Sequence, residues 1–178
     1  MKIALVYYSR TRNTEHVARV LTETLSSRGV LVDLYVVRPL REYGRPLHLN
    51  PRLLYDTLVR KGTSIKIEPC EFRAEKYDVV VVASPIWCDT LAAPVQEFLR
   101  RHITVEKPLV VVTTSLLQTS YSRIERVVEK ITGRKPVFHI NIPVAMVKDE
   151  NKLKQVVQEI TERITRIHVS RGTIRRDV

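Results

Sequence analysis

Two segments of this chain are almost wholly apolar, and they constrain the fold more than any other feature. Residues 77–83 read YDVVVVA and residues 109–113 read LVVVT. A strand without alternation of polar and apolar side chains is typical of a parallel sheet that helices cover on both faces. Residues 3–8 form a similar short run, whereas 30–37 and 137–142 are more mixed in polarity. The sequence therefore predicts five strands, of which the two mixed ones lie at the edges.

Amphipathic helices are predicted between these strands. Gly29 and Gly133 act as C-terminal stops, and Asn50 acts as an N-cap. The segment 63–76 is predicted to be a mixed connection. The expected helices are 14–28, one from Asn50 to Gly62, 92–101, one that begins with a capping box of Ser122 and Glu125, and one along 153–167.

Alternating strands and crossover helices predict a three-layer α/β domain with a doubly wound, five-stranded parallel sheet. The order 2-1-3-4-5 places the most apolar strands in the middle. We expect one domain over residues 1–169 and a basic C-terminal tail over 170–178. A ligand is expected at the carboxyl ends of the first and third strands, where the strand order reverses.

Composition limits the classes of function. The 178 residues carry a net charge of +11, but the basic residues are scattered, and no nucleic-acid-binding pattern accompanies them. No apolar run is long enough to span a bilayer, and we expect a cytoplasmic protein. Cys70 and Cys88 lack metal-ligand spacing, so no metal is expected. Few glycines and many prolines and charged residues favour a thermophilic source.

The junction between the first strand and the first helix predicts an anion site. Residues 9–14 read SRTRNT and lead directly into the helix. The first N–H groups of a helix have no partner within it, and the helix dipole adds positive potential at that end. Hydroxyls and free amides at this position suit a phosphate.

Two motifs resemble those of the flavodoxin family. The loop SRTRNT is similar to the family's phosphate loop, usually written S/T-x-T-G-N-T. The segment 84–95, SPIWCDTLAAPV, is similar to the S/T-P-I-W-x-G-x-L-A-P-P-V stretch of many flavodoxin-like reductases. Both fall in the two loops that the predicted topology places at the reversal of strand order, and the element order matches over about residues 1–167.

The resemblance implies that the chain binds FMN. The phosphate would be held by Ser9, Arg10, Thr11, Arg12, Asn13 and Thr14. Trp87 would flank the isoalloxazine ring, with Pro85 and Ile86 beside it, and Thr114 and Ser115 would begin the third flavin loop. Because the flavin itself carries the chemistry, no catalytic side chain is assigned.

The chain departs from the family pattern at three places. Arg12 and Asp89 stand where the family usually has glycine. Arg12 either takes a strained left-handed conformation or keeps an ordinary one, with its guanidinium on the phosphate. The third loop lacks the usual Gly-rich turn, so Leu116, Leu117 or Tyr121 either covers the ring or blocks it.

Two functions follow from the resemblance, and the sequence does not choose between them. One is an electron carrier, and the other is an NAD(P)H-dependent reductase of quinone-like acceptors. Expected partners are the flavin and either NAD(P)H or an acidic redox protein, and the oligomeric state is left open. The alternative is a module that has kept the fold but lost FMN, which the missing glycines motivate.

Overall fold

The computed structural model describes residues 1–44, 50–58, 63–69, 71–104, 106–118 and 121–174, with side chains described up to residue 167. Five parallel strands form the sheet in the order β2-β1-β4-β6-β7. They are β1 (Lys2–Tyr7), β2 (Leu31–Pro39), β4 (Val79–Trp87), β6 (Leu109–Ser115) and β7 (Phe138–Pro143). The predicted 2-1-3-4-5 order of parallel strands is confirmed, with strand order reversing between β1 and β4.

The sheet has two further strands that were not predicted. Strand β3 (Ile65–Glu68) pairs antiparallel with β2, and β5 (Thr90–Leu91) pairs antiparallel with β4. The prediction that 63–76 is only a connection is therefore wrong, and so is the prediction that the second strand lies at the edge. The sheet has seven strands rather than five.

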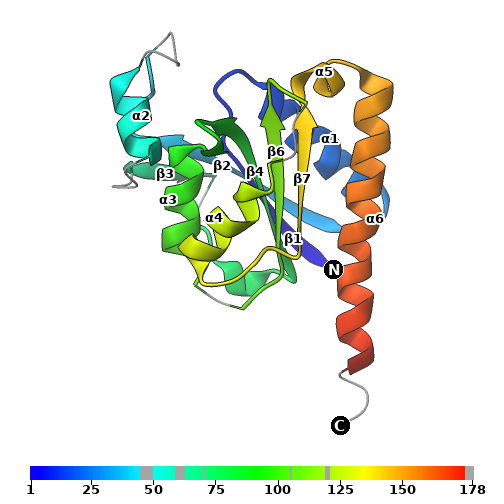
Figure 1. The fold of residues 1–178 in the computed structure, drawn as a ribbon. Helices are drawn as coiled ribbons and strands as arrows, with labels where there is room; N and C mark the ends of the chain where they lie inside the picture. Colours follow the sequence, from blue (N-terminus) through cyan, green and yellow to red (C-terminus); the bar gives the residue numbers. More distant parts are fainter. Residues whose placement is uncertain (45–49, 59–62, 70, 105, 119–120, 175–178) are drawn as a thin grey trace.

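Helices cover both faces of the sheet (Figure 1). On one face lie α1 (Asn13–Ser27), α5 (Val144–Val147) and α6 (Glu150–Ile174), and on the other lie α3 (Ala93–His102) and α4 (Arg123–Thr132). The short α2 (Pro51–Leu58) lies beside α3 at the end of the sheet (Figure 1). Among the described residues, no helix is both long and apolar enough to cross a bilayer.

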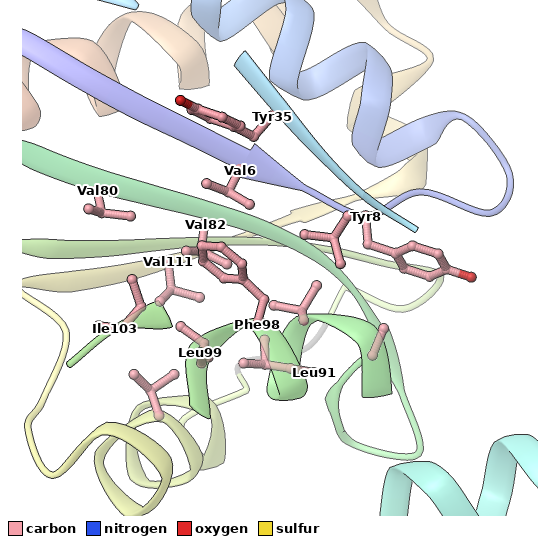
Figure 2. Packing of buried hydrophobic residues seen from close by; sticks show 14 of the residues in the cluster. Val6, Tyr8, Tyr35, Val80, Val82, Leu91, Phe98, Leu99, Ile103 and Val111 are labelled. Carbon is pink, nitrogen blue, oxygen red and sulfur yellow. The ribbon is translucent and has the colours of Figure 1, made fainter. Parts of the chain in front are cut away.

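The position of β4 in the middle of the sheet explains why its sequence is uniformly apolar. Val80 and Val82 pack into the core on the α3 and α4 side, where Phe98 of α3 points toward them (Figure 2). Val79 and Val81 pack into the opposite core under α1 and α6. Both faces are buried, so polar and apolar side chains do not alternate.

Most of the predicted helix boundaries are confirmed. Gly29 and Gly133 end α1 and α4 with φ angles of 76° and 78°, the left-handed geometry that glycine tolerates. The Asn50 side chain accepts a hydrogen bond of 3.1 Å from the Leu53 amide, as an N-cap does. The predicted end at Gly62 lies outside the described residues.

The prediction that Ser122 and Glu125 form a capping box is wrong. Ser122 has φ −56° and ψ −20°, which is helical, and its side chain makes no capping hydrogen bond. An N-cap side chain reaches the helix amides from extended backbone, which Ser122 lacks. The last helix also continues to Ile174, beyond the predicted domain boundary at residue 169.

Candidate functional site

A cleft of about 380 Å³ opens at the carboxyl ends of the central strands. The two predicted loops and the third loop all contribute to its wall. Of the residues predicted from the sequence, the wall includes Thr11, Asn13, Pro85, Ile86, Trp87, Thr114 and Ser115. The structure therefore brings together three segments that are far apart in the chain, as the predicted topology requires.

Four other residues complete the wall. Leu53 comes from α2, Val144 begins α5, and Cys88 and Leu116 follow β4 and β6. Only Leu116 was anticipated, as one of three side chains that could cover a bound ring. No sequence motif marks Leu53 or Val144, because an apolar residue at a helix start or in its first turn is indistinguishable from ordinary core.

Four of the predicted residues do not line the cleft. They are Ser9, Arg10, Arg12 and Thr14. The Thr14 hydroxyl shares a buried hydrogen bond of 2.7 Å with the Thr114 hydroxyl. This bond ties the start of α1 to the end of β6, so Thr14 holds two walls of the cleft together.

Ser9 carries a hydroxyl without a partner. Its Oγ atom is buried and forms no hydrogen bond within the described part of the chain. An unsatisfied buried hydroxyl costs about 1–3 kcal/mol, so such groups are rare unless a ligand completes them. Ser9 lies in the loop before the N-terminus of α1, where an anion is favoured.

The two arginines of this loop behave differently. The Arg10 Nε atom donates to the Tyr43 carbonyl at 3.3 Å and lies 3.7 Å from the Glu42 carboxylate. Arg10 is thus directed toward the segment that follows β2. The exposed Arg12 guanidinium makes no hydrogen bond or ion pair with any described residue.

Three residues at the cleft take left-handed backbone without being glycine. Arg12 has φ 69°, Cys88 has φ 48° and Asp89 has φ 61°. Of the two conformations left open for Arg12, the structure has the left-handed one. Arg12 and Asp89, which stand where the family usually has glycine, therefore keep this geometry at a strain of about 1–2 kcal/mol per residue.

Arg12→Gly is expected to raise the free energy of unfolding of the ligand-free protein by about 0.5 kcal/mol, because strain relief of about 1–2 kcal/mol exceeds the entropic cost of glycine of about 0.5–1 kcal/mol. Chemical denaturation measures this. Arg12→Ala removes the same guanidinium but keeps the Cβ atom, so it should bring no gain. Equal effects of the two substitutions would contradict a strained Arg12.

Trp87 forms a rigid part of the wall. It is 9% exposed, and two tyrosines meet it edge to face, Tyr8 at 5.4 Å and Tyr43 at 5.3 Å between ring centroids. The Tyr8 hydroxyl donates to Glu42 and the Tyr43 hydroxyl donates to Asp56, each at 2.8 Å. Burial raises the pKa of Tyr43 to about 12, so its hydroxyl stays protonated and keeps donating at neutral pH.

Cys88 follows Trp87 at the rim of the cleft. Burial raises the pKa of its thiol, so the nucleophilic thiolate is disfavoured at neutral pH. Cys70 lies outside the described residues. Cys88 therefore contributes to the shape of the wall, and no described residue lowers the pKa of its thiol.

His139 lies in β7, near the cleft, and is held neutral. Burial lowers its pKa from the ordinary 6.5 to about 4. Between pH 6.5 and about 4, the His139 ring binds a proton in the unfolded chain but not in the folded protein. The free energy of unfolding should therefore fall between pH 6.5 and 4, by up to about 3 kcal/mol at about 1.4 kcal/mol per pKa unit.

Denaturation at a series of pH values between 7 and 4 measures this loss. His139→Gln should reduce the pH dependence over that range, and part of it should remain because burial also lowers the pKa of His102. If the wild-type and His139→Gln curves are parallel, His139 is not the group responsible.

Several solved structures of flavoproteins are similar to this chain in fold. A flavoprotein in complex with FMN from Lactobacillus acidophilus is 15% identical, with a TM-score of 0.65 over 84% of this chain and 97% of that chain. Flavodoxin 1 from Bacillus cereus is 13% identical, with a TM-score of 0.54 over 91% and 98%. A flavodoxin from the domain Archaea is 15% identical, with a TM-score of 0.53 over 93% and 99%. At such identities the likeness shows the fold, which is that of a flavodoxin.

The fold and the cleft define a flavodoxin-like flavoprotein. Residues 1–144 match the family described as NADPH-dependent FMN reductase, and the chain belongs to this family. Its cofactor is FMN, and its function is that of an FMN-binding, flavodoxin-like redox protein. The comparison with curated protein sequences gives no match.

The residues present fit this cofactor. The unpartnered Ser9 hydroxyl lies in the loop that leads into α1, where a phosphate oxygen would complete it. The cleft wall offers the hydroxyl of Thr11 and the amide of Asn13 from that loop, and the aromatic side chain of Trp87 from the loop after β4. The polar groups suit the phosphate of FMN, and the aromatic side chain suits its ring.

Proposed function

We propose that the protein is an NAD(P)H-dependent oxidoreductase that holds FMN in the cleft and reduces quinone-like acceptors. The observation that supports this most is the cleft itself, which both predicted motifs and the third loop enclose. The family to which the chain belongs favours NADPH as the electron donor. When bound, FMN supplies the hydride and electron transfer.

The phosphate end of the site is assigned to residues 9–14. Ser9, Thr11 and Asn13 offer side-chain donors, and the first amides of α1 add the positive end of the helix. The Arg12 guanidinium is exposed and without a described partner, which leaves it available to the phosphate. Thr14 positions this loop through Thr114, and Arg10 through the Tyr43 carbonyl.

The ring end of the site is assigned to the loops after β4 and β6. Trp87, Ile86 and Pro85 form one wall, and Thr114, Ser115 and Leu116 form another. Leu116 is 85% exposed, so the cleft is open to solvent at its side. A nicotinamide or a flat acceptor can approach a bound ring from this open side.

Steady-state kinetics test the proposal. The FMN-loaded protein should oxidise NADPH when a quinone is present, and NADH serves as the comparison for the donor. Absence of oxidation with both donors, in protein that retains yellow FMN, would overturn the reductase assignment. Colourless protein that fails to bind added FMN would overturn the cofactor assignment itself.

An electron carrier is the second candidate, and one surface favours it. Arg123, Arg126 and Lys130 lie on one side of α4 and line a shallow groove with Val127. None of the described residues that line this groove is acidic, and the chain has a net charge of +11. Such a surface attracts an acidic redox protein.

If the protein is an electron carrier, Arg126→Glu should slow electron transfer to an acidic acceptor and weaken the dependence of that rate on salt, and NADPH oxidation should be absent.

A further inference from the structure

Strands β6 and β7 carry a row of polar side chains that ends at the cleft. In the register of this parallel pair, Thr113 lies beside Asn141 and Val111 lies beside His139. Thr113 and Ser115 continue the face of β6 on which Val111 packs into the core. This face is apolar below the cleft and becomes polar as it reaches the cleft.

The hydrogen bonds along this row run in one direction. Thr113 Oγ1 donates to Asn141 Oδ1 at 3.0 Å, so its single hydrogen is used. His139 Nε2 must then be the donor in its 2.8 Å contact with Thr113 Oγ1. Asn141 Nδ2 donates to Ser115 Oγ at 2.9 Å.

The last bond of the row fixes the third loop. Ser115 Oγ donates to the carbonyl oxygen of Leu117 at 2.7 Å. Leu116 and Leu117 are 85% and 66% exposed, so burial of their side chains does not hold this part of the loop in place. The loop also has no Gly-rich turn. Its conformation therefore depends on the polar row behind it.

We propose that His139, Thr113 and Asn141 are positioning residues for the flavin, acting through Ser115 on the loop that carries Leu116. None of the three lines the cleft. We call the hydrogen-bonded row of His139, Thr113, Asn141 and Ser115 the β6–β7 ladder. This inference rests on the proposed function, because it concerns the same cleft and the same cofactor.

Thr113 allows the sharpest test, because one substitution removes the hydroxyl that the ladder needs and another keeps it. Thr113→Val keeps the shape but breaks the ladder, whereas Thr113→Ser keeps the hydroxyl. Loss of the two partly buried hydrogen bonds of the Thr113 hydroxyl predicts about tenfold weaker binding of FMN to Thr113→Val, with Thr113→Ser near wild type. Riboflavin should weaken by the same factor, because the loop faces the ring rather than the phosphate.

Further measurements separate positioning from a general loss of stability. Asn141→Leu should reproduce the Thr113→Val effect and shift the reduction potential of bound FMN in the same direction. Ile140→Val, on the opposite face of β7, should do neither. Wild-type affinity and potential in both ladder variants would overturn the proposal, as would an affinity loss that the unfolded fraction alone explains.

Hydrogen exchange keeps this test separate from the test of function. In the FMN-free protein, the amides of residues 115–118 should exchange about tenfold faster in Thr113→Val than in Thr113→Ser, by the same hydrogen-bond argument. If wild-type protein fails to bind FMN, the proposed function falls, and exchange still decides whether the ladder holds the loop. Equal exchange in the two variants would overturn the ladder itself.

Discussion

Riboflavin is expected to bind on the order of 10²- to 10⁴-fold more weakly than FMN, because two charge-assisted hydrogen bonds to the phosphate contribute about 1.5–3 kcal/mol each. The two ligands share the ring and differ in the phosphate. The loop 9–14 offers that phosphate the Ser9 hydroxyl, the Thr11 and Asn13 side chains and the N-terminus of α1. Titration of the FMN-free protein by flavin fluorescence measures both affinities.

Ser9→Ala is the matched variant for this prediction. It should weaken FMN binding about tenfold while leaving riboflavin binding unchanged, since it removes one phosphate donor. It should also leave the FMN-free protein at least as stable as the wild type, because the hydroxyl that it removes has no described partner. Equal affinities of FMN and riboflavin for the wild-type protein would overturn the assignment of this loop.

The parallel core of the sheet could be predicted because burial leaves a direct mark on the sequence. The apolar runs of β4 and β6 indicate strands covered on both faces, and the structure places both in the middle. Strand β3 was missed because it has only four residues. Ile65 and Ile67 alternate with Lys66 and Glu68 as a half-buried strand requires, but so short an alternation is weak evidence.

The cleft could be predicted only where a motif marks it. Trp87 and Asn13 belong to segments with a recognisable pattern, and both line the cleft. Leu53 and Val144 reach it through the packing of helices, which no local pattern encodes. The conformation of Arg12 was also undecided, because an arginine can take either backbone geometry and only the surrounding loop selects one.

Trp87→Ala is expected to lower the free energy of unfolding of the FMN-free protein by about 3–5 kcal/mol, the usual cost of truncating a large buried aromatic side chain. Trp87 is 9% exposed, and its contacts with Tyr8 and Tyr43 would be lost. Thermal or chemical denaturation measures the loss. Trp87→Phe keeps an aromatic ring between the tyrosines, so it should lose clearly less.

The same substitution should also weaken FMN binding, because Trp87 belongs to the core and to the cleft wall at once. Stability and affinity should therefore fall together in Trp87→Ala, whereas Ser9→Ala lowers affinity alone. The contrast follows from burial: the Trp87 ring packs against Tyr8 and Tyr43, while the buried Ser9 hydroxyl has no described partner. A Trp87→Ala protein with wild-type affinity for FMN would show that the indole is a core side chain only, and that another residue forms the wall beside the ring.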